Sequence, residues 1–373
     1  VGLGNIGKQH IGHILAGAVS SCRVTAVAAR SDSGLAEQIG ATQYSDYRAL
    51  VDSGDCDAVL VATPTLSHLE IGEYVLAAGL HLLMEKPLGL SVAEGEQLLA
   101  ACANEQVFAL MLNQRTDPVF ARMKALIDEG VLGELQRTHW TMTNWFRPEV
   151  YYQVSDWRAT WRGEGGGLLV NQCIHNLDIF QWLAGMPSRI RGFCGFGKYH
   201  EIEVEDEATA YLEYANGATG VFIGSTGEAP GVNRLDLVGD RGMLSYDGDK
   251  LLLCENTPGT AQFNHETRDM FGQPQVSEQD LTPTETVNQH AMVIQNFVDA
   301  ILQGASLIAP AREGLNSLAI ANAILWSAWS GAAADLPLDS AGYQQALEKR
   351  LAESKLRVKA NIEVNVDMDK SYR

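Results

Sequence analysis

The sequence lacks the features that mark membrane, secreted and metal-binding proteins. No apolar run approaches the roughly 18 residues of a membrane-spanning helix, so we expect a soluble protein without a membrane partner. The 6 cysteines are scattered with no C-x-x-C pair, and no histidine has zinc-finger spacing, which favours free core cysteines over disulfides or a metal site. No basic segment followed by an apolar one opens the chain as a secretory signal would, so we expect it in the reducing cytoplasm.

Basic residues are also scarce. Lys and Arg number 27 against 46 Asp and Glu, which gives a formal net charge of -19. A polyanion repels the phosphates of nucleic acids and of anionic lipids, so we expect neither as a partner. The remaining composition is that of an ordinary globular protein. With 373 residues, 46% of them hydrophobic, the chain is long enough for two or three domains.

Short apolar runs alternate with helical patterns over residues 1–116. The runs at 23–29, 57–62, 81–84 and 108–112 are apolar on both faces, as strands of a parallel sheet covered on two sides are. Between the last two runs, Ser91 and Glu94 form a capping box that opens a helix. The pattern predicts an α/β domain with a doubly wound parallel sheet.

The period changes to two in the next region, residues 117–373. Asn216-Gly217 and Asp247-Gly248 each separate two alternating runs, which is typical of β-hairpins. Residues 130–280 are therefore predicted to form a largely antiparallel sheet in a second α/β domain. Two further helices are predicted at 284–303 and 311–330, and the segment after 335 shows less pattern.

The chain opens on a G-x-G-x-x-G motif, Gly2-Leu3-Gly4-Asn5-Ile6-Gly7, that leads into a helical pattern. Glycines there permit a tight turn and let the backbone approach a pyrophosphate at the helix N-terminus. We therefore expect a dinucleotide to contact Gly2, Gly4, Asn5, Ile6 and Gly7. A strand normally precedes such a motif, so we expect residues to be missing before Val1.

The residues after the second predicted strand bear on the choice of dinucleotide. Arg30 and Ser31 stand where an acidic residue would accept the ribose hydroxyl of NAD. Arg30 would pair with a 2′-phosphate, which favours NADP, whereas Asp32 is placed to bind the ribose of NAD. We expect NADP or NAD, with NADP slightly favoured.

Two more segments follow strand ends, where open α/β sheets hold ligands. The first is Ala62-Thr63-Pro64-Thr65-Leu66-Ser67-His68, from which we expect Ala62, Thr63, Pro64 and His68 to contact the cofactor. The second is Glu85-Lys86-Pro87, where Glu85 and Lys86 are costly at a buried strand end unless they meet partners or a ligand, and we expect both to contact the cofactor. A lysine beside a nicotinamide ring would stabilise developing charge on the reacting oxygen.

A polar stripe follows three glycines at 165–167. Residues 168–183 have a helical pattern in which Asn171, His175 and Asp178 fall on one face. Such a stripe on an apolar helix faces either water or a site. An imidazole with an amide and a carboxylate beside it is suited to acid–base work near neutrality.

Aromatic and Arg side chains crowd residues 145–164, just ahead of this stripe. They predict either that this segment lines the substrate-binding site or that it packs in an interface, because both kinds of surface are rich in Trp and Arg. His290 and Arg115 are weaker candidates, and His200 is expected at the surface. The residues assigned to substrate are Lys86, Arg115, Tyr152, Trp157, Arg158, Trp161, Asn171, His175 and Asp178.

Together these segments resemble the Gfo/Idh/MocA family of oxidoreductases. The resemblance rests on GLGNIG at 2–7, ATPTLSH at 62–68, EKP at 85–87 and the GGG…HNLD stretch at 165–178. It implies a Rossmann domain, a second domain with an open sheet, and homodimers or homotetramers packed through that sheet. It also implies a sugar or cyclitol substrate, catalytic roles for Lys86 and His175, and a Lys86–Pro87 bond that is often cis.

One position departs from the family. Many of its members have Asp where this chain has Asn171, and an amide cannot take a proton, so Asn171 is left to orient a substrate hydroxyl. Asp178 then either takes over part of the charge role or only anchors the helix. No metal enters this chemistry.

The predicted reaction is hydride transfer between NAD(P) and a secondary alcohol or ketone. His175 would act as general acid or base and Lys86 would stabilise the reacting oxygen. Two alternatives stay open from the sequence. One is an NAD-dependent glycosidase that oxidises its sugar transiently and eliminates the aglycone, and the other is a nucleotide-sensing regulator without catalysis.

Overall fold

The computed structural model describes residues 1–31, 33–360 and 362. The chain divides into two compact units, one with Val1–Asp117 and Val287–Leu318, the other with Pro118–Thr286 and Ala319–Arg373. The first break falls beside the boundary expected at residues 116 and 117. Residues 287–318, which we expected in the second domain, belong to the first unit instead, because their helix packs on its parallel strands.

Short apolar strands form the parallel sheets of the first unit. β1 (Ala26–Ala28) pairs with β2 (Thr42–Tyr44), and β4 (His81–Met84) lies between β3 (Ala58–Val61) and β5 (Phe108–Leu110). Val1 and Gly2 join the two sets. The Gly2 amide donates to the Ala28 carbonyl at 2.9 Å, and the Val1 carbonyl accepts from the Ala62 amide at 2.8 Å. The expected parallel α/β architecture is confirmed.

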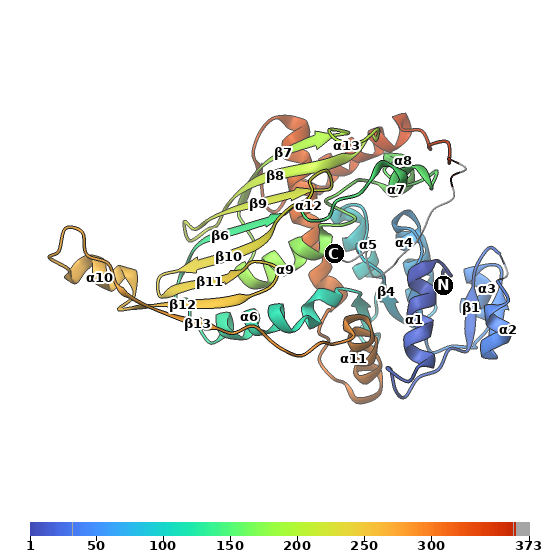
Figure 1. Cartoon of the computed structure of the whole chain (residues 1–373). Coiled ribbons are helices and arrows are strands. Elements are labelled where there is room, and N and C mark those ends of the chain that lie inside the picture. The colour runs from blue at the N-terminus through green and yellow to red at the C-terminus, as the bar shows by residue number, and fades with distance from the viewer. Residues whose placement is uncertain (32, 361, 363–373) are drawn as a thin grey trace. The chain divides into compact units, whose positions relative to one another are not determined.

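Helices cover both faces of these strands (Figure 1). Leu82 belongs to the core cluster on the side of α4 (His68–Ala77) and α5 (Val92–Ala101), whereas Leu83 packs with α11 (Gln289–Gln303). Consecutive residues of a strand point to opposite faces, so β4 is buried from both sides. The other helical segments are α1 (Asn5–Leu15), α2 (Leu35–Ile39), α3 (Tyr47–Asp52), η1 (Thr65–Ser67), η2 (Asn113–Thr116) and η3 (Ala311–Glu313).

A nine-stranded sheet forms the second unit, in the order β13-β12-β11-β10-β6-β9-β8-β7-β14. Neighbours are antiparallel except β6 and β9, which are parallel. The predicted hairpins join β8 to β9 and β11 to β12, and Gly217 and Gly248 take the positive φ values of 87° and 95° that such turns require. The strands are β6 (Leu135–Met142), β7 (Arg189–Phe196), β8 (Glu205–Glu213), β9 (Thr219–Ser225), β10 (Asn233–Gly239), β11 (Gly242–Tyr246), β12 (Leu251–Thr257), β13 (Gln275–Asp280) and β14 (Ala334–Asp335).

Aromatic side chains between this sheet and two helices make the core of the second unit. Trp140 of β6 is fully buried, with ring centroids 5.7 Å from Phe120, 6.3 Å from Phe180 and 6.5 Å from Phe222. Phe120 belongs to α6 (Pro118–Asp128) and Phe180 to α9 (Ile174–Ala184), which lie along one face of the sheet (Figure 1). The other helices are α7 (Glu149–Gln153), α8 (Trp161–Glu164), α10 (Thr260–Glu266), α12 (Gly314–Ser330), which begins in the first unit, and α13 (Ser340–Glu353).

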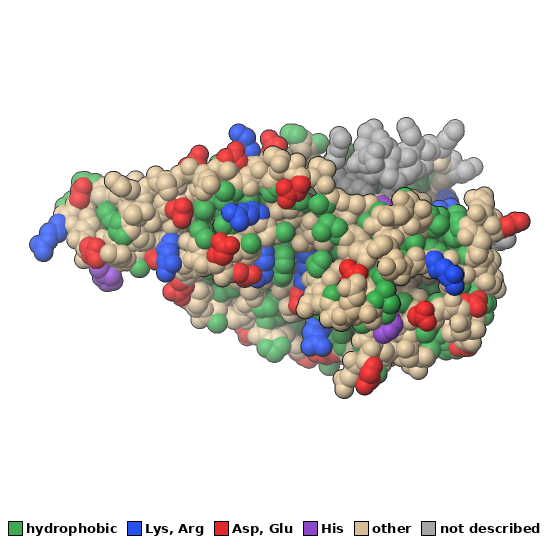
Figure 2. Space-filling model, turned by 90° about the horizontal axis from the view of Figure 1, so that it is seen from below, with side chains coloured by type: hydrophobic (Ala, Val, Ile, Leu, Met, Phe, Trp, Pro, Cys, Tyr) green, Lys and Arg blue, Asp and Glu red, His purple; other side chains and the backbone are tan. Residues whose placement is uncertain are grey.

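Helix α13 forms in the segment after 335, where the sequence showed little pattern. Asp339 caps it by accepting from the Gly342 amide at 3.1 Å, and its Tyr343 and Leu347 are buried. Among the residues described, every helix is too short or too polar to cross a bilayer, and no three potential metal ligands come together. Acidic and basic side chains are interspersed on the face drawn in Figure 2.

Candidate active site

Two of the three glycines in the loop of the first unit are packed too tightly for any other residue. Gly2 has a φ of +92°, and a Cβ there would lie 2.6 Å from the Ala62 carbonyl oxygen. A Cβ on Gly7 would collide with the Gly2 carbonyl oxygen. Gly4 caps α1 without a side-chain hydrogen bond, the first turn holds no acidic residue, and the space beside Gly4 is open. These residues fit a pyrophosphate held by the start of α1.

A cavity of about 750 Å³ lies beside this loop within the first unit. Its walls come from the bodies of β1 and β3, from α1 and from α11, and they include His10 and Phe297. Arg30, Thr63 and Lys86, which follow the strands, are absent from its lining. Of the residues expected to contact the cofactor, Gly2 and Gly7 therefore line the cavity, whereas those that follow β1, β3 and β4 do not.

The residues expected to choose between NAD and NADP follow β1. Arg30 and Ser31 are both exposed, and Arg30 stands two residues beyond the end of the strand. An exposed guanidinium at that point is compatible with binding a phosphate. Asp32, the residue expected to favour NAD, lies outside the described residues.

The segment after β3 presents some of its expected cofactor contacts and buries another. Ala62 is buried, Pro64 is exposed, and the hydroxyl of the half-buried Thr63 accepts from Ser67 Oγ at 2.9 Å. His68 is fully buried, with Nδ1 2.9 Å from the Pro87 carbonyl oxygen and Nε2 3.0 Å from that of Thr63. The expected contact between the His68 ring and a cofactor is therefore wrong, because both ring nitrogens lie on backbone carbonyls.

Glu85 is also held inside the protein. It is 7% exposed, and its Oε1 lies 2.7 Å from His10 Nε2 of α1. Burial alone would raise the pKa of Glu85, but the hydrogen bond and charge of His10 and the charge of Lys86 outweigh it and lower the pKa. Lys86 is half-buried, and the expected cis bond between Lys86 and Pro87 is confirmed.

His290 and Arg115, the weaker candidates, are both packed within the first unit. The His290 ring lies 5.5 Å from that of His10, and burial lowers the pKa of His290 to about 4. Arg115 forms an ion pair with Glu313 and donates to the Ile308 carbonyl at 3.2 Å, and none of its side chain is exposed. The assignment of Arg115 to substrate is therefore wrong, because its guanidinium is buried against η3.

In the second unit, the polar stripe is shorter than expected. α9 begins at Ile174, so His175 and Asp178 lie on the helix, whereas Asn171 lies in the hydrogen-bonded turns before it. The reason is tertiary. The Glu205 carboxylate accepts from the Gly167 amide at 3.1 Å and from the Leu169 amide at 2.9 Å, which holds these turns against β8.

Glu205 is a residue that sequence reasoning missed. It is 1% exposed, and burial raises its pKa to about 7 even though the Leu169 and Gly167 amides hydrogen-bond to it. The sequence feature that could have indicated its burial was its place at the start of an alternating strand, between the apolar Val204 and Ala208. A Cβ on Gly167 would collide with the Glu205 carbonyl oxygen, so the glycine allows this close approach.

Polar side chains close to His175 in the sequence form hydrogen bonds with other polar side chains. Asn171 Nδ2 donates to Glu164 Oε1 at 2.5 Å, and the 1% exposed Asp178 accepts from Gln181 Nε2 at 3.1 Å. His175 itself is half-buried in the first turn of α9. Burial of Asp178 supports the alternative in which it anchors the helix.

Trp157 and Arg158 form a cluster in the loop before α8. The Arg158 guanidinium lies 4.3 Å from the centroid of the Tyr151 ring and 4.8 Å from that of Trp157, and it donates to the Tyr151 hydroxyl. Ala159 has a φ of 55°, and its amide donates to Glu164 Oε2 at 2.7 Å. A non-glycine residue held in the left-handed region marks a constrained segment.

Trp161 and Tyr152 differ from this cluster because both are buried. The Trp161 ring packs 5.6 Å from Trp329 and is 6% exposed. The Tyr152 hydroxyl oxygen lies 3.0 Å from Thr226 Oγ1, and burial raises the pKa of Tyr152. Both side chains pack in the interior, and their contact with substrate stays a prediction.

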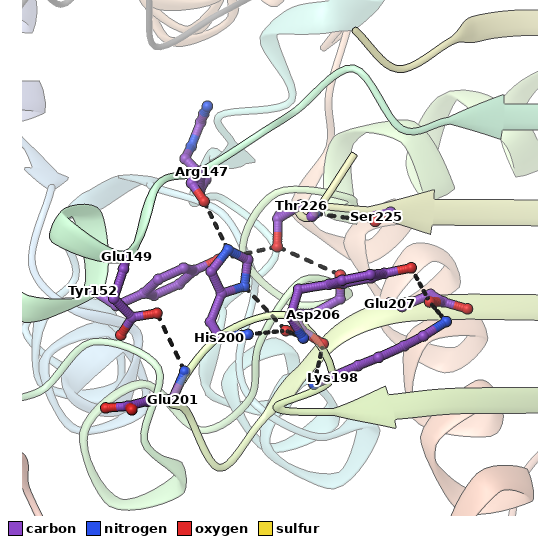
Figure 3. A network of polar contacts seen from close by, with 12 residues as sticks. Arg147, Glu149, Tyr152, Lys198, His200, Glu201, Asp206, Glu207, Ser225 and Thr226 are labelled. Atoms are coloured by element: carbon purple, nitrogen blue, oxygen red, sulfur yellow. Dashed lines mark hydrogen bonds and ion pairs between the residues drawn. The ribbon is translucent and has the colours of Figure 1, made fainter. Parts of the chain in front are cut away.

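His200 is the centre of a buried polar network and not the surface residue we expected (Figure 3). Its side chain is 5% exposed, with Nδ1 3.0 Å from Asp206 Oδ2 and Nε2 2.7 Å from the Arg147 carbonyl oxygen. The Tyr152 ring lies 4.8 Å from the His200 ring. The network thus fastens the start of the 145–164 segment to the region around β8.

Both parts of the chain match families of known proteins. Residues 1–113 match the sequence model of an oxidoreductase family with an NAD-binding Rossmann fold, and residues 120–245 match the GFO/IDH/MocA C-terminal domain. Inositol 2-dehydrogenase of Rhizobium meliloti is 25% identical over 342 residues, which are 88% of this chain and 95% of that protein. Levoglucosan dehydrogenase of Pseudarthrobacter phenanthrenivorans is 26% identical over 250 residues, 60% of each protein.

Solved structures match over most of the chain. The WlbA dehydrogenase from Bordetella pertussis, in complex with NADH and UDP-GlcNAcA, has a TM-score of 0.75 and 24% identity, over 91% of this chain and 98% of that one. Levoglucosan dehydrogenase in complex with NADH and levoglucosan has a TM-score of 0.74 and 21% identity, over 90% and 98%. These likenesses show a shared fold.

Proposed function

Because the chain belongs to the Gfo/Idh/MocA family of oxidoreductases, whose Rossmann domain is NAD-binding, we propose that it transfers hydride between NAD(P) and a secondary alcohol or ketone of a sugar, glycoside or cyclitol. The observation that carries the proposal is the place of Lys86. It is the second residue after β4, at the carboxyl end of the strand, and Ala62, at the corresponding end of β3, donates its amide to the Val1 carbonyl beside the glycine loop. The names of the relatives, an inositol and a levoglucosan dehydrogenase, support this substrate class.

Lys86 and His175 would divide the acid–base work. The nicotinamide, when bound, supplies the hydride acceptor or donor. The Lys86 ammonium donates a hydrogen bond to the reacting oxygen and stabilises the negative charge that develops there. His175 takes the hydroxyl proton at an imidazole nitrogen during oxidation and returns it during reduction. Asn171 is too weakly basic to share the proton, so it orients a hydroxyl by hydrogen bonding.

The rest of the substrate site is proposed from the second unit. Trp157 and Arg158 supply an aromatic face and a forked donor, the groups that a sugar ring and its hydroxyls need. Arg30 favours NADP, because its exposed guanidinium would pair with the 2′-phosphate. A homodimer or homotetramer and a cytoplasmic location stay predictions.

Turnover by single variants tests the proposal. Sugars, glycosides and inositols are screened with NAD and NADP while the absorbance of the reduced nicotinamide is followed. Lys86→Ala and His175→Ala should each lower turnover of the best substrate by about 10²–10⁴-fold while cofactor binding persists. The exposed positions Lys349 and His265, changed to Ala, serve as matched controls.

Two outcomes would replace the proposal. Cleavage of a glycoside by a tightly retained cofactor, without net change in absorbance, would indicate a glycosidase acting by transient oxidation. Cofactor binding without turnover across the whole panel would indicate a regulator. Near-wild-type turnover in both Lys86→Ala and His175→Ala would remove the assigned roles.

A further inference from the structure

The main chain around Lys86 is held from both sides by two buried side chains, one from its neighbour in the chain and one from the start of α4. Lys86 follows β4, and neither of its neighbours in the chain points to solvent, since Glu85 is 7% exposed and Pro87 is buried. The holding groups are Glu85 itself and His68. All of these contacts lie within the first compact unit.

On the N-terminal side, Glu85 uses both carboxylate oxygens. Oε2 accepts from the backbone amide of Lys86 at 3.2 Å, and Oε1 accepts from His10 Nε2 at 2.7 Å. The Glu85 amide in turn donates to the Val61 carbonyl at 2.9 Å, which continues the pairing of β3 and β4. Glu85 therefore connects the Lys86 backbone to the middle of α1, the helix that begins at the glycine loop.

On the C-terminal side, His68 joins the two loops that follow β3 and β4. Its Nδ1 lies 2.9 Å from the Pro87 carbonyl oxygen and its Nε2 3.0 Å from the Thr63 carbonyl oxygen. Burial lowers the pKa of His68, so its ring is neutral and carries one N–H. A carbonyl oxygen only accepts, so the ring donates to one of the two carbonyls and lies in close contact with the other. The fully buried ring thus packs between both loops and excludes water from them.

We propose that Glu85 and His68 are positioning residues for Lys86 and do not themselves contact the cofactor. They fix the backbone before and after Lys86, so that its ammonium is presented at one place. The inference rests on the proposed function, in which that ammonium stabilises the reacting oxygen. A displacement of about 1 Å in such a group costs up to about 10²-fold in rate, so loss of either side chain should reduce kcat more than substrate binding.

Glu85→Gln is the sharpest perturbation of the first contact. The carboxylate accepts from two donors at two oxygens, whereas an amide has a single oxygen. Either one N–H therefore faces the NH₂ group, or the His10 ring changes tautomer and accepts at Nε2, and the charge on the shared partner is lost in both cases. We expect kcat to fall about 10- to 100-fold, with KM for the sugar and the Kd for NADH changing less than about threefold. Glu70→Gln is the matched control, because Glu70 is an exposed partner of Arg48 in the same unit.

His68 is tested by a pair of variants. His68→Leu removes the ring donor, whereas His68→Asn keeps a donor near the position of Nδ1 and should therefore retain more of kcat. Each of Glu85→Gln and His68→Leu is also combined with Lys86→Ala. If the two residues act through Lys86, their loss changes the rate of Lys86→Ala by less than about twofold. Full additivity in these cycles would overturn the inference.

Hydrogen–deuterium exchange of the holoenzyme with NADH gives a readout independent of turnover. Peptides that span residues 85–90 should exchange faster in Glu85→Gln and His68→Leu than in the wild type, and those from the second unit should not change. Wild-type exchange in both variants would overturn the inference even if activity is lost. If exchange responds as expected but no sugar is oxidised by the wild type, the proposed function fails and the structural role of both residues stands.

Discussion

Replacement of Glu205 by Gln should remove a large pH dependence from the stability of the protein. The Glu205 carboxylate lies in the interior, where it accepts from the Gly167 and Leu169 amides, and burial raises its pKa to about 7 from the ordinary 4.5. Gln keeps one oxygen for these two amides but carries no titratable proton. The comparison therefore isolates the ionisation of one buried group.

The direction follows from proton binding. Between pH 4.5 and about 7, the folded protein holds a proton at Glu205 that the unfolded chain releases, so the free energy of unfolding falls as the pH rises. Each unit of difference in pKa corresponds to 1.36 kcal/mol, so the loss is about 3 kcal/mol. This contribution is fully present below pH 4.5 and absent above about pH 8. Glu205→Gln should lack it.

Urea unfolding at several pH values between 5 and 8.5 measures this difference. We expect Glu205→Gln to gain stability relative to the wild type as the pH rises, by up to about 3 kcal/mol. Glu213→Gln, the same change at an exposed position of β8, is the control. A difference between Glu205→Gln and wild type that stays constant over this range would refute the account of a buried carboxyl group with a raised pKa.

Two further predictions concern the core and the cofactor. Trp140→Ala should lower the free energy of unfolding by about 3–5 kcal/mol, because the fully buried ring packs against Phe120, Phe180 and Phe222, and urea denaturation would reveal it. A loss below about 1 kcal/mol would contradict this packing. Arg30→Ala should weaken NADPH about tenfold (about 1.4 kcal/mol) and NADH much less, as measured by fluorescence titration. Equal losses for both cofactors would show that Arg30 does not read the 2′-phosphate.

The pattern of apolar and turn residues correctly predicted those elements that depend on residues close to them in the sequence. The strand at 81–84 is found with the predicted bounds, because a short run that is apolar on both faces has few other stable places in an α/β unit. The two hairpins also lie where predicted, since Asn-Gly and Asp-Gly supply the positive φ values of their turns. These features depend on neighbours in the sequence.

The site was harder to predict because its contacts join distant residues. Arg115 was assigned to substrate from its place after a strand, but its partner Glu313 is 198 residues away and no local pattern announces it. The helical pattern at 168–173 was overridden by Glu205, more than 30 residues later. His68 was assigned to the cofactor from its place after a strand, but its two carbonyl neighbours, at Thr63 and Pro87, could be known only from the structure.

The order of the chain in the first unit has a consequence for synthesis on the ribosome. The apolar side of the β4 and β5 region that includes Leu83 and Met111 is covered by Ile294 and Phe297, which follow 177 and 180 residues after Asp117. A nascent chain that has emerged only as far as Asp117 would leave this side exposed to water and to chaperones. The nucleotide-binding half can therefore complete its core only after most of the other half has been translated.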